Sequence, residues 1–280
     1  MTYLPVDEHG IVDLEALKKA LRKDTLMVSI MCVNNEIGAI EPVEEIGKIV
    51  KSFDPKILFH TDCIQAYGKL NCYPKKWKAD MISVSGHKIH GPKGIGFIYI
   101  KNGTKIKPII WGGNQQKGMR SGTENVPGIV GYGVAAERAA RTMAERTAKE
   151  IEVRDYLINR ILTEIPNCRL NGDPVKRLPN NCNISFEFIE GESLLIMLDM
   201  KGICASSGSA CTSGSLDPSH VLLAIGLPHE KAHGSLRLTL SEEITKEDVD
   251  FVVEQIKAIV DRLRSMSPLY EDYIKKQQGK

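Results

Sequence analysis

The chain has 280 residues, 42% of them hydrophobic and 26% charged, which suffices for a sizeable core arranged as one large or two ordinary domains. Its 37 basic and 35 acidic residues give a formal net charge of +2, so nothing in the composition favours a nucleic acid or an anionic membrane as partner. No apolar run approaches the length of a membrane span, and we expect no secretory signal.

The first half of the chain alternates helix and strand patterns. Leu14, Leu17 and Leu21 predict a helix with Asp13 as its N-cap, and residues 42–53 predict a second helix. The apolar run 26–32 predicts a strand that is covered on both faces. Further strands are predicted over 57–61, in the residues before Lys88, and over 96–100. This alternation indicates the α/β class, with a mostly parallel sheet and helices on both of its faces.

Polar residues follow three successive predicted strands. In parallel sheets, ligands bind beyond the carboxyl ends of the strands. Residues delivered there by separate units are expected to share one crevice. The residues concerned are Asn35, Asp62, Gln65, Ser85, His87 and Lys88.

Lys88 lies in a turn, because Gly86 precedes it and Gly91-Pro92 and Gly94 prevent regular structure after it. Lysine is usually a solvated surface charge. One held between a buried strand and a glycine-rich turn is a candidate for a Schiff base with a carbonyl cofactor. The spacing by itself fits a plain surface turn equally well.

The second half begins with helical patterning that continues through about residue 165. We place a domain boundary near residue 142, which gives a large domain over 1–142 and a small C-terminal domain over 143–280. Short strands are predicted over 183–186, 203–205 and 235–240, and helices over 192–198, 219–225 and 246–264.

Seven cysteines form an odd set without a Cys-x-x-Cys pair, which disfavours a disulfide framework and a zinc ribbon. A reducing, cytoplasmic setting fits this usage. Most of the cysteines lie in apolar strands and are expected to be small buried hydrophobes. Cys211 instead lies in a serine- and glycine-rich stretch over 206–215, where it is either an incidental residue of a linker or, as we favour, an accessible reactive thiol.

Four stretches, taken together and in order, resemble the pyridoxal-phosphate-dependent cysteine desulfurases of the nitrogen-fixation and iron–sulfur-assembly type, within the class V aminotransferase fold. They are Val-Asn-Asn-Glu-Ile-Gly at 33–38, Ser-Gly-His-Lys at 85–88 with Gly-Pro-Lys-Gly at 91–94, Gly-Met-Arg-Ser-Gly-Thr at 118–123, and the serine-rich stretch around Cys211. The resemblance extends from Tyr3 to about Met266. It implies a fold type I enzyme with a smaller α/β C-terminal domain.

The resemblance also implies how the cofactor, pyridoxal 5'-phosphate, would be held. Lys88 would bind its aldehyde and then move a proton at the substrate α-carbon. Asp62 would pair with the pyridinium nitrogen, although a strand-end cap is the simpler role for such a residue. The remaining contacts would come from Asn35 and Gln65 to the ring hydroxyl, and from Ser85 and His87 to the phosphate.

Three further residues would complete the site. Arg237 would hold the substrate carboxylate together with Asn35, unless it only forms a surface ion pair. Thr123 would reach the phosphate in a neighbouring subunit, which implies a homodimer. Cys211 would attack the sulfur of L-cysteine, leaving L-alanine and a persulfide for a sulfur acceptor or an iron–sulfur scaffold protein.

The family pattern begins before the point that aligns with Met1. Its opening segment supplies a phosphate-binding helix start and a histidine that stacks on the cofactor ring, and the 280 residues contain no match to either. Either a separate chain supplies this segment, or the chain is a shortened derivative. The alternatives to a desulfurase are therefore a non-catalytic interaction protein and another class V enzyme, such as a transaminase or a selenocysteine lyase.

Overall fold

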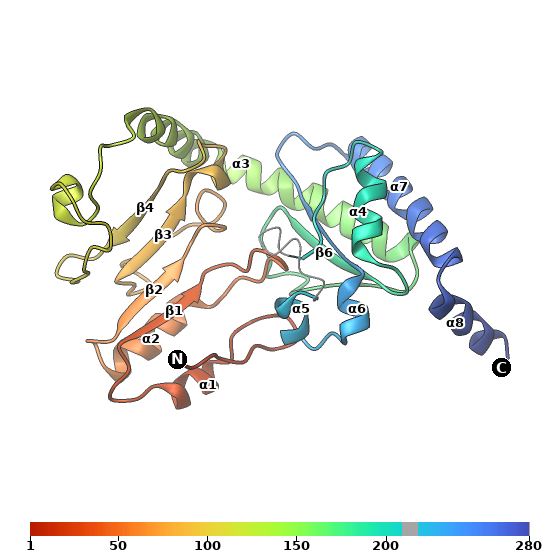
Figure 1. Cartoon of the computed structure of the whole chain (residues 1–280), viewed down its shortest axis with the longest axis horizontal. Helices are drawn as coiled ribbons and strands as arrows, with labels where there is room; N and C mark the ends of the chain where they lie inside the picture. Colours follow the sequence, from red (N-terminus) through yellow and green to blue (C-terminus); the bar gives the residue numbers. More distant parts are fainter. Residues whose placement is uncertain (209–217, 280) are drawn as a thin grey trace. The chain divides into compact units, whose positions relative to one another are not determined.

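A computed structural model describes residues 1–208 and 218–279 (Figure 1). The chain divides into two compact units. The four-stranded unit comprises residues 17–33 and 42–143, and the three-stranded unit comprises residues 1–16, 34–41 and 144–280. Two early segments, one of them carrying Asn35, therefore belong with the C-terminal half of the chain rather than with the predicted domain over 1–142.

The four-stranded unit contains one mixed sheet in the order β1-β2-β3-β4 (Figure 1). Strands β1 (Met27–Met31), β2 (Leu58–Asp62) and β3 (Met81–Ser85) are parallel, whereas β4 (Gly96–Ile100) runs antiparallel to β3. Helix α2 (Val43–Phe53) connects β1 to β2 and buries Val43, Ile46 and Val50. The predicted α/β class with a mostly parallel sheet is confirmed.

The two outer strands of this sheet are open on one side among the described residues. Strands β1 and β4 each pair with a single neighbour. Leu26 and Met27 are 78% and 48% exposed, so the prediction that both faces of this strand are covered is wrong. An apolar run indicates that burial of a strand is favourable, but the run does not show whether another segment covers that strand.

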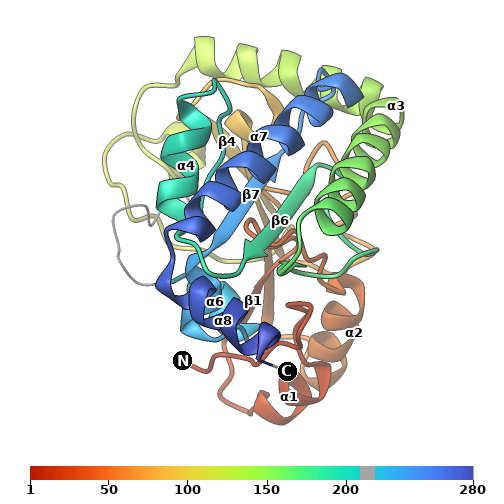
Figure 2. The same ribbon diagram turned by 90° about the vertical axis from the view of Figure 1, so that its right-hand side faces the viewer.

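The three-stranded unit contains an antiparallel sheet, β5 (Cys168–Leu170), β6 (Asn181–Phe186) and β7 (Ser235–Thr239), in that order. Helices α4 (Gly191–Asp199) and α7 (Lys246–Ser265) lie beside this sheet (Figure 2). Their apolar faces join those of β6, β7 and α3 (Val126–Glu164) in one core cluster. A capping box formed by Thr245 and Asp248 fixes the start of α7.

The remaining elements are short. Helix α1 (Leu14–Ala20) is capped by Asp13, whose Oδ1 accepts hydrogen bonds from the backbone N–H groups of Glu15 and Ala16, as predicted. Helices α5 (His220–Ala224), α6 (His229–His233) and α8 (Pro268–Gln278), with the 3₁₀ turns η1 (Gly86–Ile89) and η2 (Gln115–Gly118), complete the description.

The predicted strand over 203–205 is absent from the described part of the chain, where Ser206 forms only an isolated bridge to Arg237. Strand β5 and helices α6 and α8 were not anticipated. Strand β5 and helix α6 have only three and five residues, too few to show a period.

Among the described cysteines, Cys32, Cys63 and Cys182 are buried, as expected for small hydrophobes, whereas Cys204 is exposed. The described part of the chain thus contains an exposed thiol at Cys204. Within residues 1–208 and 218–279, no helix is both long enough and apolar enough to cross a bilayer.

Candidate active site

The carboxyl edge of the four-stranded sheet gathers two of the predicted cofactor residues. Asp62 ends β2 and pairs in register with Ser83 of β3. Strand β3 then continues to Ser85 and leads directly into the turn η1, which carries Lys88. Because β2 and β3 are parallel, Asp62 and Lys88 lie at the same edge of the sheet.

The turn that carries Lys88 is held by backbone hydrogen bonds at both ends. Gly86 N–H donates to Ile95 O over 2.8 Å, and Gly91 N–H donates to Gly86 O over 2.9 Å. His90 adopts the left-handed conformation that ends the turn. The Lys88 side chain is exposed, while the turn beneath it is fixed on the sheet.

Ser85 and His87 form a polar pair beside Lys88. The Ser85 Oγ and His87 Nδ1 atoms are 2.7 Å apart. Desolvation, with smaller contributions from the charges of Lys88 and Lys93, lowers the pKa of His87. A neutral imidazole bound to a hydroxyl is thus favoured at this position.

This set of side chains fits pyridoxal phosphate. The cofactor presents a pyridine nitrogen, an aldehyde and a phosphate, and these match a carboxylate, an amine and a hydroxyl–imidazole pair. The carboxylate of Asp62 is held at the strand end because its Oδ1 accepts the N–H of Ile64 over 2.8 Å. Gln65 follows in the same turn and is half-buried.

Asn35 belongs to a tight turn in the three-stranded unit. The Asn34 Oδ1 atom accepts hydrogen bonds from the N–H groups of Glu36 and Ile37, at 2.9 and 3.1 Å. Gly38 closes the turn with a φ of +73°, and a Cβ there would lie 2.7 Å from Asn181 Oδ1. Only glycine satisfies both conditions.

Arg237 of β7 contacts this turn directly. Its Nη1 donates to the backbone carbonyl of Asn35 over 3.0 Å. Its neighbours Leu236 and Leu238 are buried, while Arg237 itself is half-buried, which agrees with the predicted alternation along the strand. The two residues predicted to bind the substrate carboxylate are therefore adjacent within one unit.

Two other predicted residues are placed differently. Thr123 is exposed and follows the turn η2 in the chain. Cys211 lies outside the described residues.

His60 supports this edge of the sheet, although the sequence did not single it out. His60 accepts or donates hydrogen bonds on both sides, to Ser29 Oγ and Ser83 Oγ, each at 2.8 Å, and so bridges β1, β2 and β3. Burial lowers its pKa, and the charge of Asp62 opposes this effect. Side chains alternate between the two faces of a strand, so His60 and Asp62 of β2 point to the same face of the sheet. This spacing could have identified His60 from the sequence.

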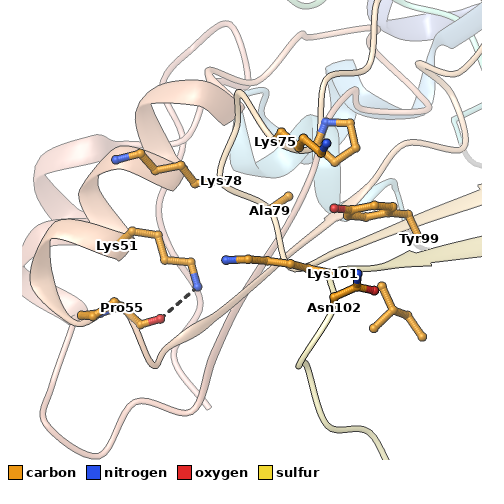
Figure 3. A pocket seen from close by; sticks show the side chains of 10 residues that line it. Lys51, Pro55, Lys75, Lys78, Ala79, Tyr99, Lys101 and Asn102 are labelled. Atoms are coloured by element: carbon orange, nitrogen blue, oxygen red, sulfur yellow. Dashed lines mark hydrogen bonds between the residues drawn. The ribbon is translucent and has the colours of Figure 1, made fainter.

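A groove of about 680 Å³ opens at the other end of the same sheet (Figure 3). Ala79 precedes β3 and Lys101 follows β4, so the groove lies opposite the edge that carries Lys88. Lys51, Lys75 and Lys78 also line it. Lys51 is nearly buried, pairs with Asp80 and donates to Ile57 O over 2.6 Å, so this lysine supports the fold.

Comparison with known proteins shows the family to which the chain belongs. Residues 1–252 match the family "Aminotransferase class-V". The chain is 53% identical over 282 residues to "Cysteine desulfurase IscS" of Clostridium botulinum, which covers all of this chain and 70% of that protein. It is also 53% identical to "Cysteine desulfurase IscS" of Methanosarcina thermophila, over 96% of this chain and 66% of that protein.

Solved structures give the same result. A "NifS-like protein" is 38% identical and superposes with a TM-score of 0.86 over 94% of this chain and 68% of that one. A NifS-like protein from Rickettsia africae is 34% identical, with a TM-score of 0.85 over 92% and 69%. The chain therefore belongs to the class V aminotransferase family, among its cysteine desulfurases of the IscS and NifS type.

Proposed function

We propose that the chain carries out the desulfuration of L-cysteine with pyridoxal 5'-phosphate as cofactor. The observation that carries this proposal is the placement of Lys88 in a fixed turn at the sheet edge that also bears Asp62. The net reaction converts the Cys211 thiol and L-cysteine into a Cys211 persulfide and L-alanine. One C–S bond breaks and one S–S bond forms, the proton lost by the thiol is balanced by the new C–H bond of alanine, and no external oxidant is required.

Bound pyridoxal phosphate supplies an electron sink for the substrate's α-carbon. Lys88 would hold the aldehyde end of the cofactor and would carry a proton to and from that α-carbon. Asp62 would hold a negative charge against the ring nitrogen, and Gln65 and Asn35 would bind the ring hydroxyl. Ser85 and His87, joined by their own hydrogen bond, would bind the phosphate through the one remaining donor of the pair.

Arg237 and Asn35 orient the substrate carboxylate. A guanidinium presents two parallel donors that match a carboxylate. The hydrogen bond from Arg237 to the Asn35 carbonyl fixes one side of that guanidinium. The fixed guanidinium also sets the position of Asn35.

We also propose that two copies of the chain associate, with Thr123 of each reaching the phosphate of the other. Apolar residues that are more than half exposed support this, because apolar side chains left in water favour burial against a partner. They are Ile109, Trp111, Val126, Val130 and Val134, all within the four-stranded unit near Thr123. The persulfide would pass its sulfur to a sulfur-acceptor protein or an iron–sulfur scaffold protein.

A separate polypeptide that supplies additional strands would fit the open edges of the same unit. Strands β1 and β4 each retain one unpaired edge among the described residues, and Phe97 and Ile98 of β4 are 39% and 47% exposed. Strand addition would pair these edges and cover their side chains.

The absorption spectrum of the purified chain mixed with pyridoxal phosphate tests the function. A visible band that responds to L-cysteine, accompanied by stoichiometric or catalytic release of L-alanine, is the expected result. Failure to take up the cofactor would instead select a non-catalytic interaction protein. Transfer of an amino group to a keto acid independently of Cys211 would select a transaminase.

A further inference from the structure

Glu36 is a buried acid in the three-stranded unit, with 1% of its surface exposed. Its Oε2 atom accepts a hydrogen bond from Ser219 Oγ over 2.5 Å. The same Oγ accepts the N–H of Val221 over 3.1 Å and thereby caps α5. Since the Ser219 oxygen is already an acceptor, its single proton is directed at Glu36.

The backbone of Glu36 is fixed from the other side. Asn181 and Asn183 of β6 both donate to Glu36 O, over 3.0 and 3.1 Å. Arg177, itself buried, donates to the next carbonyl, Ile37 O, over 3.2 Å. The carboxylate therefore projects from a rigid base that is also the turn carrying Asn35.

The chain before Cys211 meets the chain after it at this carboxylate. Gly208 has a φ of +52°, and a Cβ placed on it would lie 3.4 Å from Glu36 Oε2 and 3.3 Å from Ser219 Cβ. Gly208 directly precedes residues 209–217, which lie outside the described part of the chain. Ser219 follows that stretch after Pro218. Two residues earlier, Ser206 and Arg237 exchange backbone hydrogen bonds of 3.1 and 2.6 Å.

We propose that Glu36 is a positioning residue for the sulfur-accepting thiol. Its carboxylate is hydrogen-bonded to Ser219, which follows residues 209–217, and lies beside Gly208, which precedes them, so it links this part of the chain to the turn of Asn35. It thereby sets where the Cys211 segment starts and ends relative to the groups that orient the substrate. This inference rests on the proposed function for the identity of the thiol, whereas the contacts of Glu36 do not depend on it.

The physical reason is the entropy of bringing the thiol to its target. A segment whose ends are fixed beside the substrate-binding residues searches a smaller volume than one whose ends are free. Small losses of alignment lower reaction rates strongly, roughly a hundredfold for a displacement near 1 Å. The side chain of Glu36 acts on the thiol segment, while its backbone supports Asn35, so substitution of the side chain separates the two effects.

The test compares Ser219→Ala, Ser219→Thr and Glu36→Gln with the parent chain, each loaded with the cofactor. In single turnovers, the rate at which the Cys211 peptide gains one sulfur atom is followed by mass spectrometry. We expect roughly a tenfold fall for Ser219→Ala and Glu36→Gln, with the KM for L-cysteine changed by less than about twofold. Ser219→Thr keeps the hydroxyl and should restore the rate.

Glu41→Gln is the matched control, because Glu41 is a second buried acid of the same unit and accepts a hydrogen bond from Val12 N–H, over 3.0 Å, away from the segment. This variant should keep the parent rate. Equal losses in Glu36→Gln and Glu41→Gln, a parallel rise in KM, or no rescue by Ser219→Thr would overturn the proposal.

Amide hydrogen exchange of residues 206–208 and 219–222 supplies a readout that needs no activity. Protection of these amides should fall in Glu36→Gln and Ser219→Ala and stay at the parent level in Glu41→Gln and Ser219→Thr. If the parent chain forms no alanine, the proposed function fails, and the exchange data alone decide whether Glu36 holds the two ends. Unchanged protection in Glu36→Gln would reject that role.

Discussion

The guanidinium of Arg237 donates a hydrogen bond to the backbone carbonyl of Asn35 over 3.0 Å, although 202 positions separate the two residues in the chain. The turn of Asn35 is thereby built into the C-terminal part of the protein, on β6 and β7. Asn35, which is predicted to orient the substrate, therefore lies in the same turn as Glu36, whose carboxylate is beside Gly208 and Ser219. These two residues flank the stretch 209–217 that includes Cys211. Substitutions at this junction are expected to affect substrate binding and sulfur transfer in separable ways.

Replacement of Arg237 tests the substrate-binding half of this junction. A charge-assisted hydrogen bond contributes about 1.5–3 kcal/mol, so Arg237→Lys should raise the KM for L-cysteine roughly ten- to hundredfold, because an ammonium lacks the two-pronged geometry. Steady-state alanine formation measures this. Arg169→Lys, on strand β5 of the same sheet and exposed, is the control. An unchanged KM in Arg237→Lys would assign the carboxylate to another group.

Lys88 is expected to be indispensable for cofactor chemistry. Lys88→Ala should remove the visible absorption of the bound cofactor and lower alanine formation by about 10²- to 10⁴-fold, since the proton carrier is lost. Absorption spectra and amino-acid analysis provide the measurements. Lys93→Ala changes an exposed lysine of the same glycine-rich stretch and should retain both signals. A normal spectrum in Lys88→Ala would contradict the assignment.

Cys211 is expected to act after the cofactor has engaged the substrate. Cys211→Ala should bind the cofactor and respond spectrally to L-cysteine, while alanine formation and protein-bound persulfide are lost. Cys204 provides a nearby exposed cysteine for comparison, and Cys204→Ala should form the persulfide normally. Alanine release at the parent rate from Cys211→Ala would identify a different sulfur acceptor.

Asp80 is expected to be important for the stability of the four-stranded unit. Its carboxylate pairs with the nearly buried Lys51 and accepts the N–H of Phe59 over 2.8 Å. Asp80→Asn leaves the lysine charge unpaired, which should lower the free energy of unfolding by roughly 3 kcal/mol. Urea denaturation gives the value. Glu44→Gln, which breaks surface pairs with Lys48 and Lys76, should shift the midpoint far less.

Glu41 predicts a specific dependence of stability on pH. Burial raises the pKa of its carboxyl from 4.5 to about 7. The folded state therefore binds this proton more tightly than the unfolded state, and the free energy of unfolding should fall as the pH rises from about 4.5 to about 7. Glu41→Gln is neutral throughout, so it should equal the parent chain near pH 4.5 and be more stable at pH 8. Denaturation curves at both pH values test this, and a constant difference between the two proteins would contradict it.

Sequence reasoning was most effective where a pattern is local. The helix cap at Asp13, the helix α2 and the strands β2, β3 and β4 follow from periodicity and from residues within a few positions of one another. The order of the motifs around Asn35, Lys88, Thr123 and Cys211 was likewise sufficient to indicate the family. These features can be predicted from short stretches of sequence, because helix and strand propensity, capping and turn chemistry depend on residues that are close together in the chain.

The tertiary structure decided what those stretches are attached to. The apolar run 26–32 predicted a strand covered on both faces, yet Leu26 and Met27 are exposed among the described residues. The sequence shows Glu36 only as one residue of the stretch 33–38, whereas the structure places Ser219 and Gly208 beside its carboxylate. Asn35 belongs with Arg237, because Asn181, Asn183 and Arg177 satisfy the carbonyls of its turn. Such pairings depend on which distant polar groups meet once the chain is folded, and no local period encodes them.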